Sequence, residues 1–158
     1  MTAFDEFIQS SKVKIDPKNR LPVGSALKRD ESSLSDSLML TIGFDGCLYF
    51  MPADEWNDLM AKLKEKGATN SQAIRFERTI TTYASKVKPD AQWRVVVSPD
   101  LMELAGFSNE KREASLIWVG GHLEVWEKSN LESYMSGQTY KLHPVVQSLK
   151  QAAEELTL

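Results

Sequence analysis

Two short segments of the chain each hold an aspartate four positions before an arginine. The first segment holds Asp16 and Arg20 and the second holds Asp90 and Arg94, so the motifs lie 74 positions apart. A carboxylate in a turn can accept hydrogen bonds from backbone amides and hold a nearby guanidinium in one pose. A guanidinium held in this way offers a planar fork of donors, which suits phosphate or the edge of a guanine base.

Two interpretations of these motifs are open. In the first, each pair only braces its own turn, and a single motif would favour this interpretation. In the second, the aspartates are structural and the arginines contact a partner, while the two lysines near the first motif position a phosphate backbone. The repetition of the motif favours the second interpretation. The candidate contact residues are then Arg20, Lys18, Lys14 and Arg94, and the candidate structural residues are Asp16 and Asp90.

Charge is distributed unevenly along the chain. The 19 basic and 22 acidic residues give a net charge of −3, which taken alone disfavours a nucleic-acid partner. Residues 11–29, however, hold six basic residues against one acidic residue, and residues 74–94 hold five against two. A local field acts over roughly 8 Å at physiological salt, so these basic segments matter more than the net charge. One such segment alone would be read as a solvated face, but both contain the aspartate–arginine motif.

The sequence does not predict an enzyme, a cofactor or a metal site. His122, His143 and the single cysteine, Cys47, do not have the spacing of metal ligands, and one cysteine permits no intrachain disulfide. Cys47 lies in an apolar strand, which favours buried packing over nucleophilic chemistry. His122 and Glu124 alternate along a predicted strand, and we interpret them as an exposed polar edge. Phosphate-binding glycine loops and nucleophile elbows do not occur.

The elements around the two motifs are also repeated. A glycine turn leads into a strand at residues 43–50 and again at residues 119–126, and the leucines Leu48 and Leu123 are 75 positions apart. The agreement between the two offsets indicates an internal duplication, in which each copy contributes two hairpins and a helix. We expect strands at residues 12–15, 38–42, 47–51, 93–97, 115–119 and 122–127. We expect helices at residues 53–67, 71–83, 101–105 and from 131, an exposed loop at 28–37, and a core that includes Trp56, Trp118 and Trp126.

A final helix is predicted from Pro144, because proline suits the first helical position and apolar residues then recur on one face. It packs either on the body of the chain or on a partner subunit. The first residues lack the basic and apolar regions of a signal peptide, and no apolar run approaches the roughly 20 residues that span a bilayer. We therefore expect a soluble, cytoplasmic protein with no membrane partner.

The chain resembles the MraZ family of bacterial transcriptional regulators over about residues 7–136. The resemblance is carried by the paired Asp-x-x-x-Arg motifs and by the run LTIGFDGCLY at residues 40–49, which is followed by Pro52 and the helix start at Glu55 and Trp56. It implies an α+β, mainly β fold, namely a duplicated swapped-hairpin AbrB-like barrel with flanking helices and a C-terminal helix. The implied division is a first AbrB-like repeat at 1–68, a second at 69–136 and a tail with a helix at 137–158.

The resemblance also implies a function. Members of this family form homo-oligomeric rings that bind repeated promoter boxes in double-stranded DNA near division and cell-wall genes. The expected protein is therefore a cytoplasmic, nucleoid-associated regulator of transcription that needs no cofactor. A ring that contacts several boxes at once gains affinity through effective concentration, provided that the spacing matches.

Several residues depart from the family pattern, in which the motif reads Asp-x-Lys-Gly-Arg. Asn19 replaces the glycine of the first motif, while Gln92 and Trp93 replace the lysine and glycine of the second. Gly24 and Ile42 replace a proline and an arginine. We therefore expect the second motif to read DNA more weakly, with Trp93 either stacking on DNA or filling a subunit contact. The alternative function is a diverged ring that has lost DNA binding and serves as a scaffold or protein-interaction module.

Overall fold

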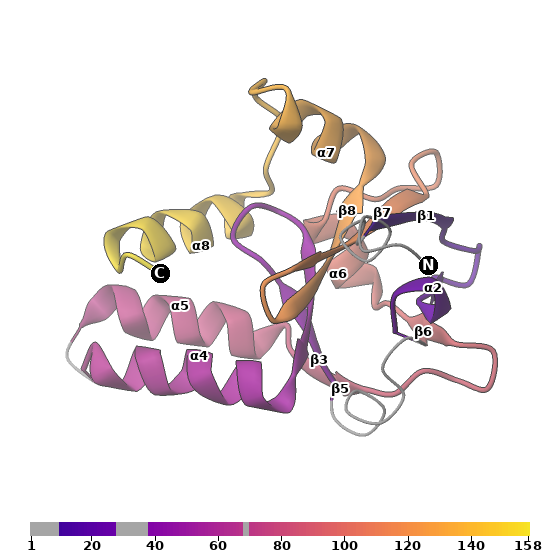
Figure 1. Cartoon of the computed structure of the whole chain (residues 1–158). Helices are drawn as coiled ribbons and strands as arrows, with labels where there is room; N and C mark the ends of the chain where they lie inside the picture. The colour runs from indigo at the N-terminus through magenta and orange to yellow at the C-terminus, as the bar shows by residue number, and fades with distance from the viewer. Residues whose placement is uncertain (1–9, 28–37, 68–69) are drawn as a thin grey trace, which may run out of the picture.

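The computed structural model describes residues 10–27, 38–67 and 70–158 (Figure 1). The strands are β1 (Ser10–Lys14), β2 (Arg20–Pro22), β3 (Leu38–Ile42), β4 (Leu48–Pro52), β5 (Ser85–Val87), β6 (Arg94–Val96), β7 (Glu113–Val119) and β8 (His122–Glu127). The helices are α2 (Gly24–Leu27), α4 (Ala53–Glu65), α5 (Ser71–Thr82), α6 (Pro99–Leu104), α7 (Lys128–Met135) and α8 (Pro144–Glu155).

Six of these strands form one antiparallel sheet in the order β1-β7-β8-β4-β3-β5, and β2 and β6 form a separate two-stranded ribbon. The α+β class and its antiparallel pairing are as predicted. The expected closed barrel is not seen within the described residues, because β1 and β5 end the sheet and the ribbon strands pair only with each other. The description "mainly β" is wrong, since the described helices hold more residues than the described strands.

The duplication is visible in how the strands pair. β1 pairs with β7, with Val13 opposite Ala114, and β5 pairs with β3, with Val87 opposite Leu38. Val13 and Val87 are 74 positions apart, and Leu38 and Ala114 are 76 apart, so the second pairing repeats the first. β4 and β8 pair at the centre of the sheet. The first strand of each copy therefore joins the sheet beside a strand of the other copy, and the two halves share one core.

Three long helices cover one side of the sheet. α4 lies beside α5, and α8 packs along α5, so that these helices stand on one side of the sheet while α2 and β6 stand on the other (Figure 1). The C-terminal helix begins at Pro144 as predicted and packs on the body of its own chain. None of the helices in the described ranges has the length and apolar character needed to cross a bilayer. The residues that α8 buries are Val146, Leu149, Ala152 and Ala153.

Two helices differ from the sequence-based expectation by more than two residues. α7 begins at Lys128 rather than at residue 131, because the Glu127 carboxylate accepts hydrogen bonds from the backbone N–H groups of Ser129 and Asn130 and so caps the helix earlier. The four residues of α2 were not predicted, since one helical turn is too short to show a periodic pattern. The loop expected at 28–37 lies outside the described residues.

The core is largely the predicted one. Trp126 and Cys47 are buried, which confirms their assignment to the interior. Trp56 and Trp118 are only partly buried and pack against the core from its margin. The indole N–H of Trp118 donates to the Ala26 carbonyl at 3.2 Å, so its position at the margin satisfies its polar edge.

Candidate nucleic-acid interface

The loop before β2 is organised around the Asp16 carboxylate. Its Oδ1 accepts hydrogen bonds from the backbone N–H groups of Lys18 and Arg20, each at 2.9 Å. Its Oδ2 accepts a hydrogen bond from Nε of Arg20 at 2.5 Å. One carboxylate thus fixes the backbone of the loop and the guanidinium that follows it.

The loop before β6 repeats this arrangement. Oδ1 of Asp90 accepts from the N–H groups of Gln92 and Arg94 at 2.9 Å, and Oδ2 accepts from Nε of Arg94 at 3.1 Å. Asn19 and Trp93 occupy the same place in the two loops, with positive φ angles of 61° and 57°. A glycine takes this backbone conformation without strain, so the glycine of the family pattern is the easier residue at both positions.

Both aspartates are held in their ionised form. Desolvation alone would raise the pKa of Asp16, but hydrogen bonds from the backbone and side chain of Arg20 and from the Lys18 N–H lower that pKa below its ordinary value. The hydrogen bond from the Arg94 backbone N–H is the largest influence on Asp90, whose pKa is also lowered. Each loop therefore keeps a carboxylate charge next to its arginine.

Two backbone hydrogen bonds join the loops to each other. The N–H of Val23 donates to the carbonyl of Trp93, and the N–H of Val97 donates to the carbonyl of Asn19, each at 2.8 Å. The two bonds bracket the β2–β6 ribbon, one at each end. The loops are therefore parts of a single unit with approximate twofold symmetry.

The ribbon has a buried face and an outer face. Leu21 and Val95 are directly opposite each other in the register and are buried in the core. Side chains alternate along a strand, so their neighbours point away from the core. The outer face carries Arg20, Pro22, Arg94 and Val96. The structure thus brings the two predicted arginines together on one face of the ribbon.

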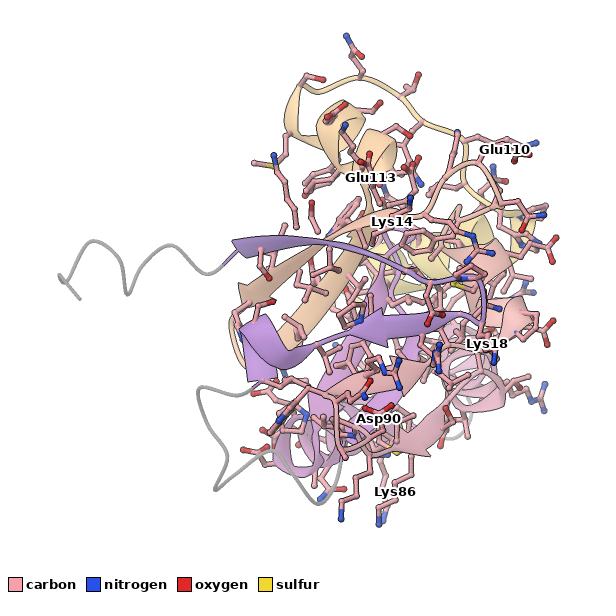
Figure 2. The ribbon with its side chains drawn as sticks, turned by 90° about the vertical axis from the view of Figure 1, so that its right-hand side faces the viewer. Lys14, Lys18, Lys86, Asp90, Glu110 and Glu113 are labelled. Atoms are coloured by element: carbon pink, nitrogen blue, oxygen red, sulfur yellow. The ribbon has the colours of Figure 1, made fainter. Side chains whose placement is uncertain are left out.

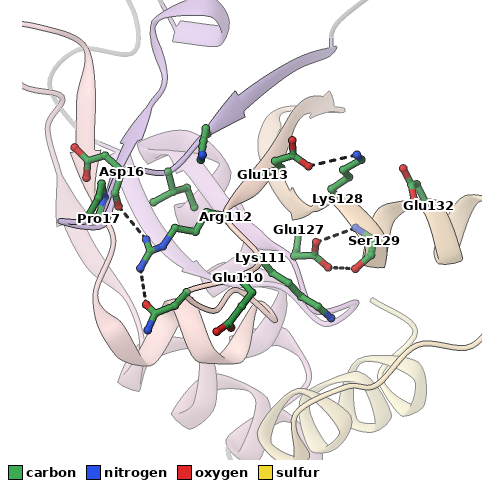
Figure 3. Close-up of a pocket in the computed structure, with 13 residues that line it drawn as sticks. Asp16, Pro17, Glu110, Lys111, Arg112, Glu113, Glu127, Lys128, Ser129 and Glu132 are labelled. Carbon is green, nitrogen blue, oxygen red and sulfur yellow. Dashed lines mark hydrogen bonds and ion pairs between the residues drawn. The ribbon is translucent and has the colours of Figure 1, made fainter.

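The two predicted lysines, Lys18 and Lys14, lie beside the ribbon but have different neighbours. Lys18 is exposed on the first loop, within the side of the molecule that Figure 2 presents to the viewer. Lys14 lies opposite Glu113 in the register of β1 and β7, and the two side chains are seen close together in Figure 2. Lys14 also lines a groove of about 1050 Å³ to which Glu110 contributes (Figure 3). Lys14 therefore lies near carboxylates, of which Glu113 is 3.3 Å from Nζ of Lys128 (Figure 3), whereas Lys18 lies next to the ribbon.

Arg112 supports the first loop and was not singled out from the sequence. Its Nη1 donates to the Asp16 carbonyl at 2.9 Å and to Oδ1 of Asn19 at 3.1 Å. Its Nη2 donates to Oδ1 of Asn109 at 3.1 Å (Figure 3). Arg112 is 96 positions from Asp16 and lies in an irregular stretch before β7, so no local pattern could have indicated this role.

One sequence-based interpretation at β8 is wrong. His122 and Glu124 are partly buried rather than an exposed polar edge, and His122 Nε2 lies 3.1 Å from Glu124 Oε2. Glu124 Oε1 also accepts a hydrogen bond from the indole of Trp126 at 2.9 Å, and the His122 ring lies 4.4 Å from that of Tyr49. His122, Glu124 and Trp126 share one face of β8, and Tyr49 joins them because β4 pairs with β8. In the described part of the chain, no cluster of histidine, cysteine or acidic residues has the composition of a metal site.

Two residues that depart from the family pattern, Ile42 and Trp93, lie in or against the core. Ile42 is fully buried at the end of β3, so that side chain belongs to the core and not to the surface of the ribbon. Trp93 is partly buried and packs against the core of its own chain.

Comparison with known proteins agrees with the duplication. Residues 7–79 and residues 80–144 each match the model of the MraZ protein family, which is described as antitoxin-like. The chain is 36% identical over 128 residues to the "Transcriptional regulator MraZ" of Clostridium acetobutylicum, a stretch that covers 81% of this chain and 86% of that protein. It is 33% identical over 129 residues to the protein of the same name from Kineococcus radiotolerans, covering 82% and 86%. It is 29% identical over 135 residues to the one from Acetivibrio thermocellus, covering 85% and 90%. With two tandem matches that span most of its length, this chain belongs to the MraZ family.

Proposed function

We propose that this protein is a sequence-specific DNA-binding regulator of transcription that contacts double-stranded DNA through the outer face of the β2–β6 ribbon. The observation that carries the proposal is that two arginines, each braced by its own aspartate, share that face. A two-stranded ribbon fits the major groove of B-DNA, where side chains reach the base edges. The relatives named as transcriptional regulators support the same function.

The bracing explains how an arginine could discriminate among bases. Because the aspartate holds Nε, the two Nη groups are the donors that can meet the O6 and N7 atoms of guanine or a phosphate. A guanidinium that is already oriented loses less side-chain entropy when it binds. We therefore assign base contacts to Arg20 and Arg94, and structural roles to Asp16 and Asp90.

The lysines have a different proposed role. Lys18 lies on the loop next to Arg20 and would contact the phosphate backbone, which sets the register but does not read sequence. Lys14 would make a weaker contact, since Glu113 lies opposite it. Removal of a lysine contact should weaken binding to every duplex by a similar factor, whereas removal of an arginine contact should weaken mainly the specific complex.

We further propose that the chain is a duplicated AbrB-like fold whose hairpins are swapped between its copies, with repeats at 1–68 and 69–136 and a tail at 137–158. The exchange of β1 and β5 between the two halves of the sheet supports this assignment. In this proposal the protein acts as a homo-oligomeric ring on repeated promoter boxes near division and cell-wall genes, in the cytoplasm at the nucleoid.

The test is DNA binding across a salt series, with a duplex from the region upstream of the protein's own gene and a scrambled duplex of the same length. Each phosphate contact should steepen the fall of log K with log salt by about 0.9. Arg20→Ala should abolish the preference for the upstream duplex without unfolding the protein. Lys18→Ala should lower the salt slope by about 1 for both duplexes.

Arg78→Ala is the matched control, because Arg78 is exposed on α5 and its loss changes the net charge equally. If Arg20→Ala still bound the upstream duplex with normal specificity, the assignment of base contacts to Arg20 would be wrong. A folded, oligomeric wild-type protein that bound neither duplex at low salt would favour the alternative, a scaffold or protein-interaction module that has lost DNA binding.

A further inference from the structure

Val96 is a large apolar residue on the surface that we propose for DNA. It lies at the end of β6 and is 65% exposed, more than most of the described apolar side chains. The exposed residues Val119, Tyr134 and Met135 lie on other elements, in β7 and α7. Val96 is thus an apolar group beside two arginines. Its position is exposed to solvent, so the packing of the chain does not require an apolar side chain there.

The register specifies the neighbours of Val96. It lies directly opposite Arg20, and in the symmetric position Pro22 lies directly opposite Arg94. The backbone hydrogen bonds that bracket the ribbon make both of these non-hydrogen-bonded pairs. The Cβ atoms of such pairs are about 4.5–5.5 Å apart. Pro22 fits this arrangement, because its position requires no N–H donor from the ribbon.

Each arginine on the outer face therefore has a small, rigid apolar group beside it. Valine has few rotamers when its backbone is in a strand, so its methyl groups stay where the backbone puts them. In the major groove, the apolar feature that such a group can recognise is the C5-methyl group of thymine. A cytosine methylated at C5 presents the same group.

We propose that Val96 is a specificity-determining residue that contacts a pyrimidine C5-methyl group in the major groove, one or two base pairs from the base that Arg20 contacts. The inference rests on the proposed DNA-binding function, and it adds a preference that the arginines cannot supply. Pro22 offers a second, smaller apolar surface beside Arg94.

The experiment is a methyl scan of the duplex from the upstream region of the protein's own gene. Each thymine of that duplex is replaced in turn by deoxyuridine, which keeps the base pairing and removes only the methyl group. Wild-type protein should bind about fourfold more weakly at one such position per box, the equivalent of one lost methyl contact. Val96→Ala should bind the unmodified duplex about fourfold more weakly and should be insensitive to deoxyuridine at that position.

Val119→Ala is the matched control, because Val119 is 43% exposed on β7, away from the ribbon, and undergoes the same truncation. It should keep the full deoxyuridine effect. A parallel series of duplexes, in which single cytosines carry a C5-methyl group, distinguishes thymine from methylated cytosine as the source of the methyl group. If methylation of a cytosine raises affinity and deoxyuridine has no effect at any thymine, the contact is to a modified cytosine.

Two results would overturn the proposal while leaving DNA binding intact. The first is specific binding by the wild type with no methyl effect at any thymine or cytosine. The second is an unchanged methyl effect in Val96→Ala. A change in the oligomeric mass of that variant by light scattering would then assign Val96 to a subunit contact. If the wild-type protein bound no duplex specifically, the proposed function itself would fail, and the inference with it.

Discussion

A single carboxylate organises each loop of the ribbon, and its charge is part of that role. Asp16 accepts two backbone hydrogen bonds with one oxygen and a guanidinium with the other, and Asp90 does the same in the second copy. The residues between the aspartate and the arginine differ in the two loops, since Asn19 of the first loop corresponds to Trp93 of the second. The loop conformation therefore depends on the aspartate and tolerates variation at the position with positive φ.

The lowered pKa of Asp16 predicts a pH-dependent effect of Asp16→Asn. The asparagine keeps an oxygen acceptor for the backbone but loses the charge next to Arg20. A carboxyl group with a lowered folded pKa stabilises the protein fully above its unfolded value of 3.8, and this stabilisation is lost as the pH falls through the lower folded value. The variant should be less stable than wild type near neutral pH, and the difference should shrink below about pH 4.

Urea denaturation at a series of pH values measures this difference. Asp58→Asn serves as the control, because Asp58 is exposed on α4 and has no hydrogen bond to the loops. A stability difference between wild type and Asp16→Asn that stayed constant from pH 7 to about pH 3 would mean that the charge of Asp16 does not stabilise the loop.

The buried cysteine predicts slow thiol chemistry. Burial raises the pKa of the Cys47 thiol, and the nearby charges of Glu124 and Asp45 raise it further. Reagents that need a thiolate should therefore react only when the protein opens. With a stability of about 5 kcal/mol, labelling in native buffer at pH 8 should be roughly four thousandfold slower than in urea. Rapid stoichiometric labelling of the native protein would show that Cys47, directly before β4, is not buried as described.

At the scale of elements, local signals predicted the elements better than their partners. Alternation predicted β8 with its observed bounds, and proline together with an apolar stripe predicted the start of α8. The pairing of β1 with β7 joins residues roughly a hundred positions apart, and the period of a strand says nothing about its partner. The family resemblance implies swapped hairpins, but it does not specify which strand pairs with β1.

The candidate site divides in the same way. The motif itself indicated that Asp16 would brace its loop. The position of Arg20 and Arg94 on one face depends on the β2–β6 pairing, and Arg112 reaches the first loop from a distant part of the chain. Such contacts are tertiary and leave no periodic trace, so a single sequence does not reveal them.

The α5–α8 contact predicts a large cost for Leu149→Ala. Leu149 is fully buried where α8 packs along α5, so its truncation removes apolar contacts and leaves a cavity. The free energy of unfolding should fall by about 2–5 kcal/mol, measured by urea denaturation. Gln151→Ala, on the exposed side of the same helix, should change it by no more than about 0.5 kcal/mol. Equal effects of the two substitutions would contradict the packing of α8 on its own chain.

At the scale of the whole molecule, the proposed interface lies away from the helices. α4, α5 and α8 stand on one side of the six-stranded sheet, and β6 stands on the other (Figure 1). The arginines of the ribbon act locally in a chain with a net charge of −3, because screening limits their field to about a Debye length. In the proposed function, one ribbon per chain with one or two base contacts per arginine would give modest affinity, so strong binding would need several chains acting together.

A ring therefore predicts that affinity depends on the spacing of the boxes. If several ribbons of one ring contact one duplex, a second box raises affinity by about 10²–10⁴, but only when both boxes face the ring. Inserting about 5 base pairs between two boxes turns the second to the opposite side of the helix, and inserting about 10 restores its direction. Affinity measured by gel shift should fall sharply with the shorter insertion and recover in part with the longer one, whereas Arg20→Ala should bind all three duplexes equally weakly. Equal wild-type affinity for all three would mean that each chain binds on its own, and that oligomerisation has no part in recognition.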